Sequence, residues 1–501
     1  MLLNAPRELS EPVRAGVAPG HRAGMPIGAR ERARLRLVWV VMVIYLLAIF
    51  EGSIRKFVVP QFGQYVFFIR DPLLLYAYVV ASRFGLWPRQ SLLFDLSVFM
   101  CGFGVCLFAM QVAVGGLDAT RALLGVYGWR NYFLYVPLAF LVGAQVRAAD
   151  LARFAKVTLW LAVPIAVLVS LQFFSAKDAS INVGVAEEKE LQFEAFGLNA
   201  ERIRPSGPFT SNVGQQQFVV TALVFLLAML LVPASQRAVS VVVLIVAAGA
   251  ILTCIGLSGS RGTVLQSVLT GLFALALGVV GRGAGLKGRA LVLPLMLGAA
   301  AVSLYPIVLP EGFAAFTDRW TAAAAASTSA GQGSDGGVAL RTWLGFTDFL
   351  RLVDAVPTLG YGLGYGGNAS LILRATVDGV MPGFLAEADF SRHMVDLGAV
   401  FGLCYIAFRF AVVAWLARQA WTATRRTSRA MPMLLFSYAG YVVLQSQITG
   451  HGSVNVYGWL FAGLCIAASR DALESVVQKR TVRPFWHGRL RPSTSLGIKF
   501  K

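Results

Sequence analysis

Long runs of apolar residues alternate with short polar segments along most of the chain. Each run approaches the roughly 20 residues with which an α-helix crosses the hydrocarbon core of a bilayer. The pattern predicts an all-α integral membrane protein with about 12 transmembrane helices. The predicted spans are residues 35–50, 64–82, 91–114, 123–146, 153–174, 214–233, 238–257, 262–280, 289–309, 393–416, 431–449 and 452–469.

The segments that connect these spans are alternately basic and non-basic. The basic set carries most of the 44 Lys and Arg residues and consists of the N-terminal arm, 83–90, 147–156, 234–237, 281–289, 417–430 and the C-terminal tail. Because cytoplasmic loops are rich in Lys and Arg, both termini are predicted to be cytoplasmic. The expected order is a disordered arm at 1–34, spans 1–9 within 35–309, a large periplasmic loop at 310–392, spans 10–12 within 393–469 and a basic tail at 470–501.

Composition agrees with a membrane protein and excludes other classes. Hydrophobic residues make up 57% of the chain and charged residues 14%, which leaves too little polar surface for a soluble protein of this length. The net charge of +19 does not indicate a nucleic-acid partner, because the excess lies in short loops and no basic stripe is interleaved with aromatic residues. The five cysteines lie inside apolar runs, so neither a disulfide framework nor a zinc site is expected.

Two of the predicted outer loops are long, at 175–213 and 310–392. In the second, Ala322–Gly337 is rich in Ala, Gly, Ser and Thr, which predicts a flexible stretch. Apolar residues then recur on one helical face from Trp343 to Val353, which predicts a short amphipathic helix on the outer membrane surface.

Several arginines are candidates for binding phosphate. The segment Ser258-Gly-Ser-Arg-Gly262 separates two spans, and its glycines allow a close approach to a ligand that Arg261 could hold bidentately. A tight turn with a snorkelling arginine is the alternative. Arg70, inside the second predicted span, either pairs with the adjacent Asp71 or lines a cavity. Arg130 could likewise face a lipid phosphate.

The order of motifs in the second half of the chain resembles that of the bacterial O-antigen ligase and polymerase family. The SGSRG segment is followed by Arg341 in the large loop, then by Gly360-Tyr-Gly-Leu-Gly364, and then by Asp396-Leu-Gly398 at the next span. Three upstream segments are similar to a subset associated with exopolysaccharide biosynthesis: Glu51–Lys56, Arg70–Pro72 and Gly128–Tyr132.

The resemblance implies a GT-C-like glycosyltransferase of the bacterial inner membrane that needs neither a metal ion nor a cofactor. Its donor would be a glycan on undecaprenyl pyrophosphate, presented at the periplasmic face to a saccharide acceptor, and chain-length regulators and export proteins would be its partners. Arg261 and Arg341 match the arginines that hold the pyrophosphate in the family, with Arg392, Arg130 and Arg70 as further candidates.

One departure from the family pattern concerns the base. Family ligases place a histidine eleven residues before the glycine that is here Gly398, and this chain has Glu387 at that position, with Asp389 two residues later. Either carboxylate could accept the proton of the acceptor hydroxyl. An ordinary solvated acidic patch and a metal site with oxygen ligands are the alternatives, and the resemblance argues against the metal.

Three functions remain open from the sequence. The carboxylate in place of the ligase histidine, together with the upstream motifs, favours a polymerase that joins lipid-linked repeats. A ligase that transfers the finished glycan to lipid A core is a close variant. A transporter or flippase of lipid-linked glycan is the third, although no internal repeat typical of transporters is evident in the sequence.

Overall fold

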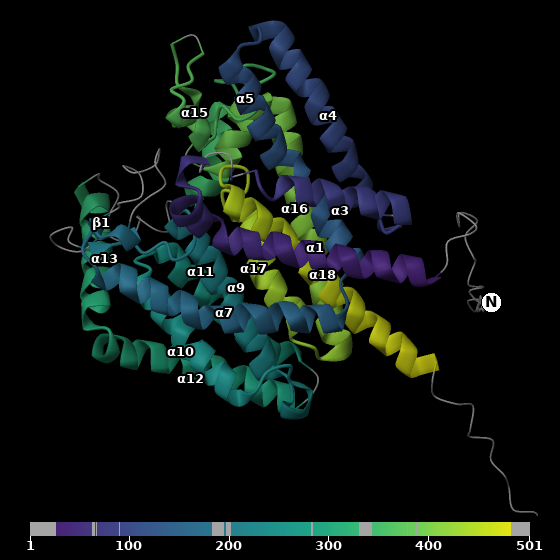
Figure 1. The fold of residues 1–501 in the computed structure, drawn as a ribbon, viewed down its shortest axis with the longest axis vertical. Coiled ribbons are helices and arrows are strands. Elements are labelled where there is room, and N and C mark those ends of the chain that lie inside the picture. The colour runs from purple at the N-terminus through teal and green to yellow at the C-terminus, as the bar shows by residue number, and fades with distance from the viewer. Residues whose placement is uncertain are drawn as a thin grey trace, which may run out of the picture.

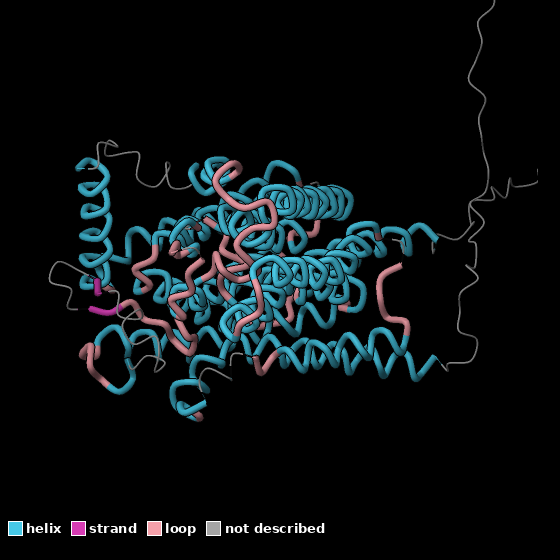
Figure 2. Tube along the Cα trace, turned by 90° about the horizontal axis from the view of Figure 1, so that it is seen from above, coloured by secondary structure: helices cyan, strands magenta, loops and turns pink. Residues whose placement is uncertain are grey.

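The computed structural model describes residues 27–62, 66, 68–89, 91–182, 195–196, 202–281, 284–329, 343–377, 379–386 and 388–481. The described part of the chain is built from helices, with a single pair of two-residue strands at one edge (Figures 1 and 2). In the first half lie α1 (Ile27–Ser53), α3 (Asp71–Phe84), α4 (Leu92–Gly115), α5 (Ala119–Trp129), α6 (Val136–Gln145), α7 (Ala148–Phe174), β1 (Ala195–Phe196), β2 (Arg202–Ile203) and α9 (Asn212–Leu231). In the second half lie α10 (Val241–Leu257), α11 (Arg261–Val280), α12 (Ala284–Val308), α13 (Pro310–Ser329), α15 (Asn368–Ile372), α16 (Asp389–Thr427), α17 (Met431–Gln445) and α18 (Gly452–Thr481).

The chain is a multi-pass helical membrane protein. Within the described residues, eight helices are long and apolar enough to cross a bilayer. Helices fall on all 12 predicted ranges, but in four of these ranges no single helix is both long and apolar enough to cross a bilayer. Three are short, namely α3, α10 and α17, and the fourth is split into α5 and α6 by a π-helical turn at Arg130–Leu134. The predicted count of 12 spans is therefore not confirmed.

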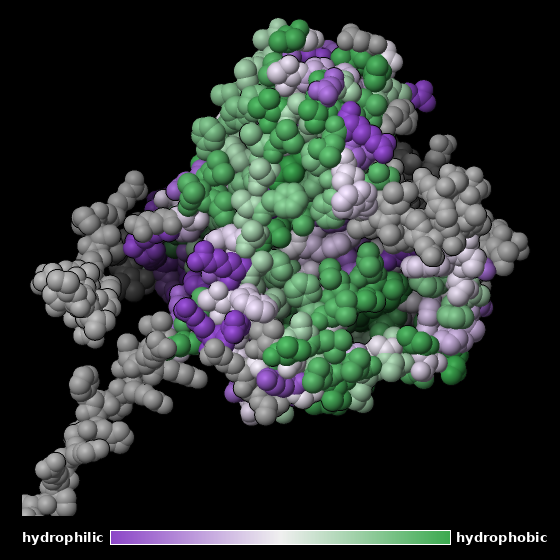
Figure 3. Space-filling view, turned by 180° about the vertical axis from the view of Figure 1, so that it is seen from behind, coloured by the Kyte–Doolittle hydropathy of each residue, from purple (hydrophilic) through white to green (hydrophobic). Residues whose placement is uncertain are grey.

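Helix α18 lies at the centre of the bundle and packs against α6, α16 and α17. In its most apolar window 89% of the residues are buried, against 6% in α12, so α18 is a core helix and α12 presents its sides to lipid. Aromatic rings fill the core around α18, where Tyr45 and Tyr438 pack edge-on against Phe461. The surface seen in Figure 3 accordingly shows broad hydrophobic areas.

The predicted large loop contains more regular structure than the sequence pattern suggested. Helix α13 continues through Ser329 and so includes the first part of the stretch Ala322–Gly337 that was expected to be flexible. The reason is its run of alanines, the residue with the highest helix propensity. The remainder of that stretch lies outside the described residues.

The next helical residues, 343–352, pack only part of their apolar face on the protein. Phe346 and Phe349 contact Phe390 at ring-centroid distances of 6.0 Å each, whereas Trp343 and Leu350 are 65% and 58% exposed. One part of the apolar face therefore packs on the start of α16, and the other part is exposed.

Helix α16 is bent at Gly398, whose φ of 80° lies in the left-handed region. A Cβ at this glycine would lie 2.0 Å from the carbonyl oxygen of Thr358, so no other residue fits the bend. The bend separates a buried first segment, Asp389–Leu397, from the long apolar remainder. This first segment carries most of the polar residues described next.

Candidate functional site

The glycine-rich loop Gly360–Gly364 is clamped between α4, α5 and α16. Gln111 of α4 donates to the carbonyls of Leu359 and Asp396 at 2.7 and 2.8 Å and accepts from the backbone amide of Leu363 at 3.0 Å. Gly364 has φ +85°, and a Cβ there would lie 2.3 Å from the carbonyl oxygen of Leu124. Glycine is therefore required for the loop to lie this close to α5.

A first group of buried charges lies where α1, α3 and the π-helical turn meet. Arg70, which is fully buried, pairs with Glu51, its Nη2 lying 2.8 Å from Oε2. The adjacent Asp71 pairs instead with Arg130 at 2.5 Å and accepts a hydrogen bond from Tyr135 at 2.7 Å. Arg70 and Asp71 thus bond to different helices, because adjacent residues at a helix start point in different directions.

A second group surrounds Asp389 at the start of α16. Its carboxylate accepts hydrogen bonds from Arg409 at 2.5 Å, from Arg392 at 3.1 Å and from the hydroxyl of Thr449 at 2.8 Å. Arg409 also donates to the carbonyls of Val443, Leu444 and Ser446 at 2.7, 3.1 and 3.2 Å. Arg409 therefore fastens the end of α17 to α16, and Asp389 balances its buried charge.

A chain of hydrogen bonds leads from Arg409 to the glycine-rich loop. The guanidinium of Arg409 can only donate, so Nε2 of His393, at 2.6 Å, accepts, and the neutral ring carries its proton on Nδ1. Nδ1 lies 3.1 Å from the hydroxyl of Tyr132, which donates to Asp396 at 3.0 Å. Asp396 also accepts from the backbone amide of Gly366 at 2.5 Å.

Asn131 joins the two charged groups into one network. Its side chain accepts from Arg130 at 2.9 Å and donates to the carbonyl of Thr449 at 3.1 Å. Asn455 of α18 in turn donates to the carbonyl of Asn131 at 2.5 Å. Residues from widely separated parts of the sequence thus form a buried polar network inside an apolar bundle, hereafter the buried network.

The SGSRG turn lies at the same end of the bundle. Ser260 caps α11 and donates to Gln216 of α9 at 3.2 Å, while Gly259 adopts a φ of +55°. Helix α11 packs antiparallel on α17 with Thr270 opposite Ser437 at 3.5 Å. Since both helices rise equally per residue, this register brings Arg261 level with Ser446, whose carbonyl accepts from Arg409.

The predicted site residues are distributed as follows. Arg70, Arg130, Asp389 and Arg392 are brought together in the buried network, and Arg261 begins α11. Two further candidates, Glu387 and Arg341, lie outside the described residues. Among the described residues, no group of three or more His, Cys, Asp and Glu side chains is placed to hold a metal ion.

Sequence reasoning assigned no role to several members of the network, among them Arg409, Tyr132 and Thr449. Arg409 carried a usable signal, because a charged residue inside an apolar span is usually paired or functional. Tyr132 lay at the end of a recognised motif without an assigned role. Nothing in the sequence distinguishes Thr449 from other threonines at span ends.

Comparison with known proteins places the chain in no established family. No family model and no curated protein matches it. A solved structure of a peptidoglycan synthase complex, reported for its structural coordination of polymerization and crosslinking, is similar over 74% of this chain and 97% of that chain. The sequence identity is 16% and the TM-score 0.34, and at that level the likeness supports no functional conclusion.

Proposed function

We propose that the protein is a polysaccharide polymerase that joins oligosaccharide repeats carried on undecaprenyl pyrophosphate at the periplasmic face of the inner membrane. In the reaction, a hydroxyl oxygen of the acceptor saccharide forms a bond to the anomeric carbon of the donor. The bond from that carbon to the pyrophosphate oxygen breaks, and undecaprenyl pyrophosphate leaves with the electron pair. Attack opposite the leaving group inverts the anomeric configuration.

The observation that carries the proposal is the convergence of separate motifs. Glu51, Arg70–Asp71 and Arg130–Tyr132 come from the three upstream segments, and Asp389–Asp396 lies between the glycine-rich loop and Gly398. Burying so many charges in an apolar bundle is costly, and such groups mark functional sites in membrane proteins. Motifs with unrelated structural roles would not be expected to contact one another in one network.

The contacts of Asp389 distinguish its role from that of Glu387. Asp389 is 4% exposed and both of its oxygens accept hydrogen bonds from protein groups, so it has little capacity to take a substrate proton. We assign Asp389 to positioning Arg392 and Arg409, and Glu387 to accepting the proton of the acceptor hydroxyl.

The charge balance of the network suits a pyrophosphate. Arg55 also lies by the network, its Nη1 3.8 Å from Oε1 of Glu51. The buried charges are then those of five arginines, Arg55, Arg70, Arg130, Arg392 and Arg409, and four carboxylates, Glu51, Asp71, Asp389 and Asp396. The excess positive charge would attract a polyanionic leaving group in a medium of low dielectric constant. Arg261 and Arg341 are assigned to direct contact with the pyrophosphate, with Arg392, Arg130 and Arg70 behind them.

The test is deletion of the gene in its native host, with complementation by wild type and variants. Loss of long surface polymer, with single lipid-linked repeats accumulating, is expected, and neither Glu387→Gln nor Arg261→Ala should restore it. Two exposed residues of the same predicted loop supply matched controls, Asp354→Asn and Arg351→Ala, and both should restore normal polymer.

Other outcomes would replace the proposal. Long polymer retained on undecaprenyl pyrophosphate but missing from lipid A would show a ligase. An unchanged glycan profile after deletion would favour a transporter. Full rescue by both Glu387→Gln and Arg261→Ala would refute the assigned active site.

A further inference from the structure

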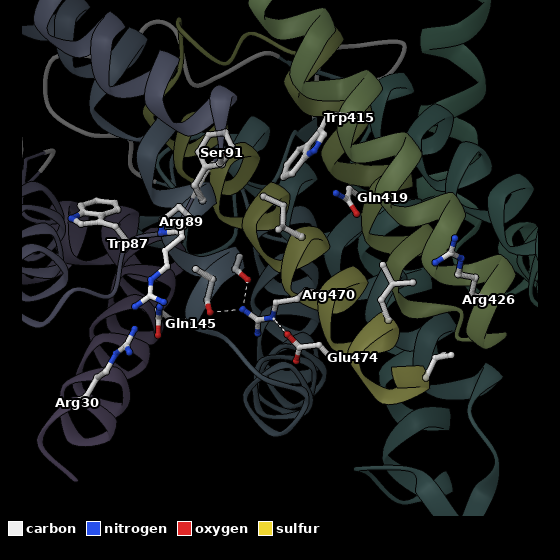
Figure 4. Close-up of a pocket in the computed structure, with 17 residues that line it drawn as sticks. Arg30, Trp87, Arg89, Ser91, Gln145, Trp415, Gln419, Arg426, Arg470 and Glu474 are labelled. Atoms are coloured by element: carbon white, nitrogen blue, oxygen red, sulfur yellow. Dashed lines mark hydrogen bonds and ion pairs between the residues drawn. The ribbon is translucent and has the colours of Figure 1, made fainter. Parts of the chain in front are cut away.

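A cavity of about 1160 Å³ lies between α1, α6, α16, α18 and the turn before α4. Its walls carry four arginines, Arg30, Arg89, Arg426 and Arg470, and two tryptophans, Trp87 and Trp415 (Figure 4). Among the described residues that line it, Glu474 is the one acidic side chain. The cavity is separate from the buried network, and the proposed glycosyl transfer makes no use of it.

The cavity and the buried network lie at opposite ends of the helices. Arg30 is in the first turn of α1 and Glu51 in its last turn, and Arg426 and Asp389 are at opposite ends of α16. The 21 residues from Arg30 to Glu51 correspond to roughly 30 Å of helix, the thickness of a hydrocarbon core. The cavity therefore lies at the depth of lipid headgroups, on the side that the loop charges predict to be cytoplasmic.

The four arginines differ in how far the protein uses them. Arg470 donates to the carbonyls of Gly143, Ala144 and Val146 at the end of α6 and lies 3.5 Å from Glu474. Arg30 donates to the carbonyl of Gly85 at 3.1 Å.

Arg89 and Arg426 are exposed, and neither has an ion pair or hydrogen bond with another residue in the described part of the chain. Glu474, the acidic residue of the lining, pairs with Arg470, so the charges of Arg89 and Arg426 are not balanced by a paired carboxylate and a bound anion would compensate them. Guanidinium groups also match the oxygens of a phosphate in a bidentate geometry.

The remainder of the lining indicates a lipid and not a soluble phosphate. Phe140, Ile466 and Leu473 supply apolar wall beside the arginines. Trp87 stacks on Phe94 at 5.2 Å between ring centroids, and tryptophan is enriched at the level of lipid headgroups. The volume exceeds that of an inorganic phosphate ion many times over and is in the range of sites for much larger ligands.

We propose that this cavity binds the headgroup of an anionic phospholipid, with Arg89 and Arg426, which lie on opposite sides of it, supplying the unpaired positive charge that attracts the lipid. Basic pockets between helices at the cytoplasmic surface are suited to such headgroups. A lipid at this position would touch α1, α6, α16 and α18 together and so would stabilise their packing.

The test is native mass spectrometry of the full chain in detergent, titrated with dioleoyl phosphatidylglycerol or dioleoyl phosphatidylcholine. Wild type is expected to bind phosphatidylglycerol at least tenfold more tightly than phosphatidylcholine, because the choline cation is repelled by the arginines. Arg89→Gln combined with Arg426→Gln should remove at least tenfold of that affinity. A matched control is Arg83→Gln with Arg418→Gln, two exposed arginines at the same end that do not line the cavity.

Each result decides the proposal. Loss of binding in the Arg89/Arg426 double variant but not in the control pair supports it, provided both proteins keep the thermal unfolding midpoint of wild type without added lipid. Equal binding by wild type and the Arg89/Arg426 double variant overturns it. Displacement of phosphatidylglycerol by inorganic phosphate at equal concentration also overturns it and assigns the site to a soluble phosphate compound.

Discussion

The ion pair between Glu51 and Arg70 is expected to stabilise the protein far more than a surface pair of the same length. Nη2 of Arg70 lies 2.8 Å from Oε2 of Glu51, and the two side chains are 0% and 5% exposed. At the effective dielectric constant of about 20 that describes protein sites, unit charges this close attract by about 4–6 kcal/mol. None of the three guanidinium nitrogens of Arg70 has a hydrogen-bond partner in the described part of the chain, so removing Glu51 leaves the buried charge poorly compensated.

A double-mutant cycle measures the coupling directly. The variants are Glu51→Gln, Arg70→Gln and the combination, with unfolding free energies obtained by titrating detergent-solubilised protein with dodecyl sulfate. Each single variant should lose about 3–5 kcal/mol, because it leaves one buried charge unpaired. The combined variant should lose less than the sum of the two, by about 3 kcal/mol or more.

The pair Arg429–Asp471 is a matched control. Its ion-pair distance is also 2.8 Å, but the side chains are 47% and 26% exposed. Its coupling should be below about 1 kcal/mol, since solvent screens it. If the Glu51–Arg70 cycle gives a coupling as small as this control, the conclusion that the network holds tightly paired buried charges is refuted.

Three further predictions use the same unfolding measurement. Tyr132→Phe removes the hydroxyl between His393 and Asp396 and should lower the free energy of unfolding by about 1–3 kcal/mol. Tyr76→Phe, at an exposed tyrosine, should change it by less than about 0.5 kcal/mol, and equal effects of the two variants would contradict the chain of hydrogen bonds through Tyr132. Gly364→Ala should cost about 2–5 kcal/mol through backbone strain and a clash with Leu124, but Gly379→Ala, with φ +76° and open space around it, only about 1–2 kcal/mol. Burial and the nearby Arg392 lower the pKa of His451 to about 4. Between pH 6.5 and 4 the unfolded chain therefore binds the proton first, and stability falls as the pH falls. His451→Gln should reduce this pH dependence of stability, and an unchanged dependence would contradict the lowered pKa.

The sequence predicted the helical membrane architecture because hydrophobic run length is a strong signal in a bilayer. Helices fall on all the predicted ranges, but the predicted count of 12 spans is not confirmed, because some of these helices are short or broken. The π-helical turn at Arg130–Leu134 is such a break, and no residue pattern in that segment distinguishes it from a continuous helix. The helical start of Ala322–Gly337 was missed because small residues are shared by flexible linkers and by alanine-rich helices.

The site was only partly accessible to sequence reasoning. The motifs around Arg70, Arg130 and Asp389 were recognised, but their partners were not, because pairing depends on how distant helices pack. Asp71 bonds to Arg130, 59 positions away, although Arg70 is its neighbour. Arg409 is 20 positions from Asp389 and meets it through the bend at Gly398, which brings a short buried segment back against the rest of α16.

The most direct test of the proposed function is reconstitution. The purified protein in liposomes is given oligosaccharide repeats linked to undecaprenyl pyrophosphate, and the length of the products is measured by gel electrophoresis. Products of several repeats with release of undecaprenyl pyrophosphate are expected, absent with Glu387→Gln and retained with Asp354→Asn. Repeats that remain single with wild type, or that are joined equally well by Glu387→Gln, would contradict it.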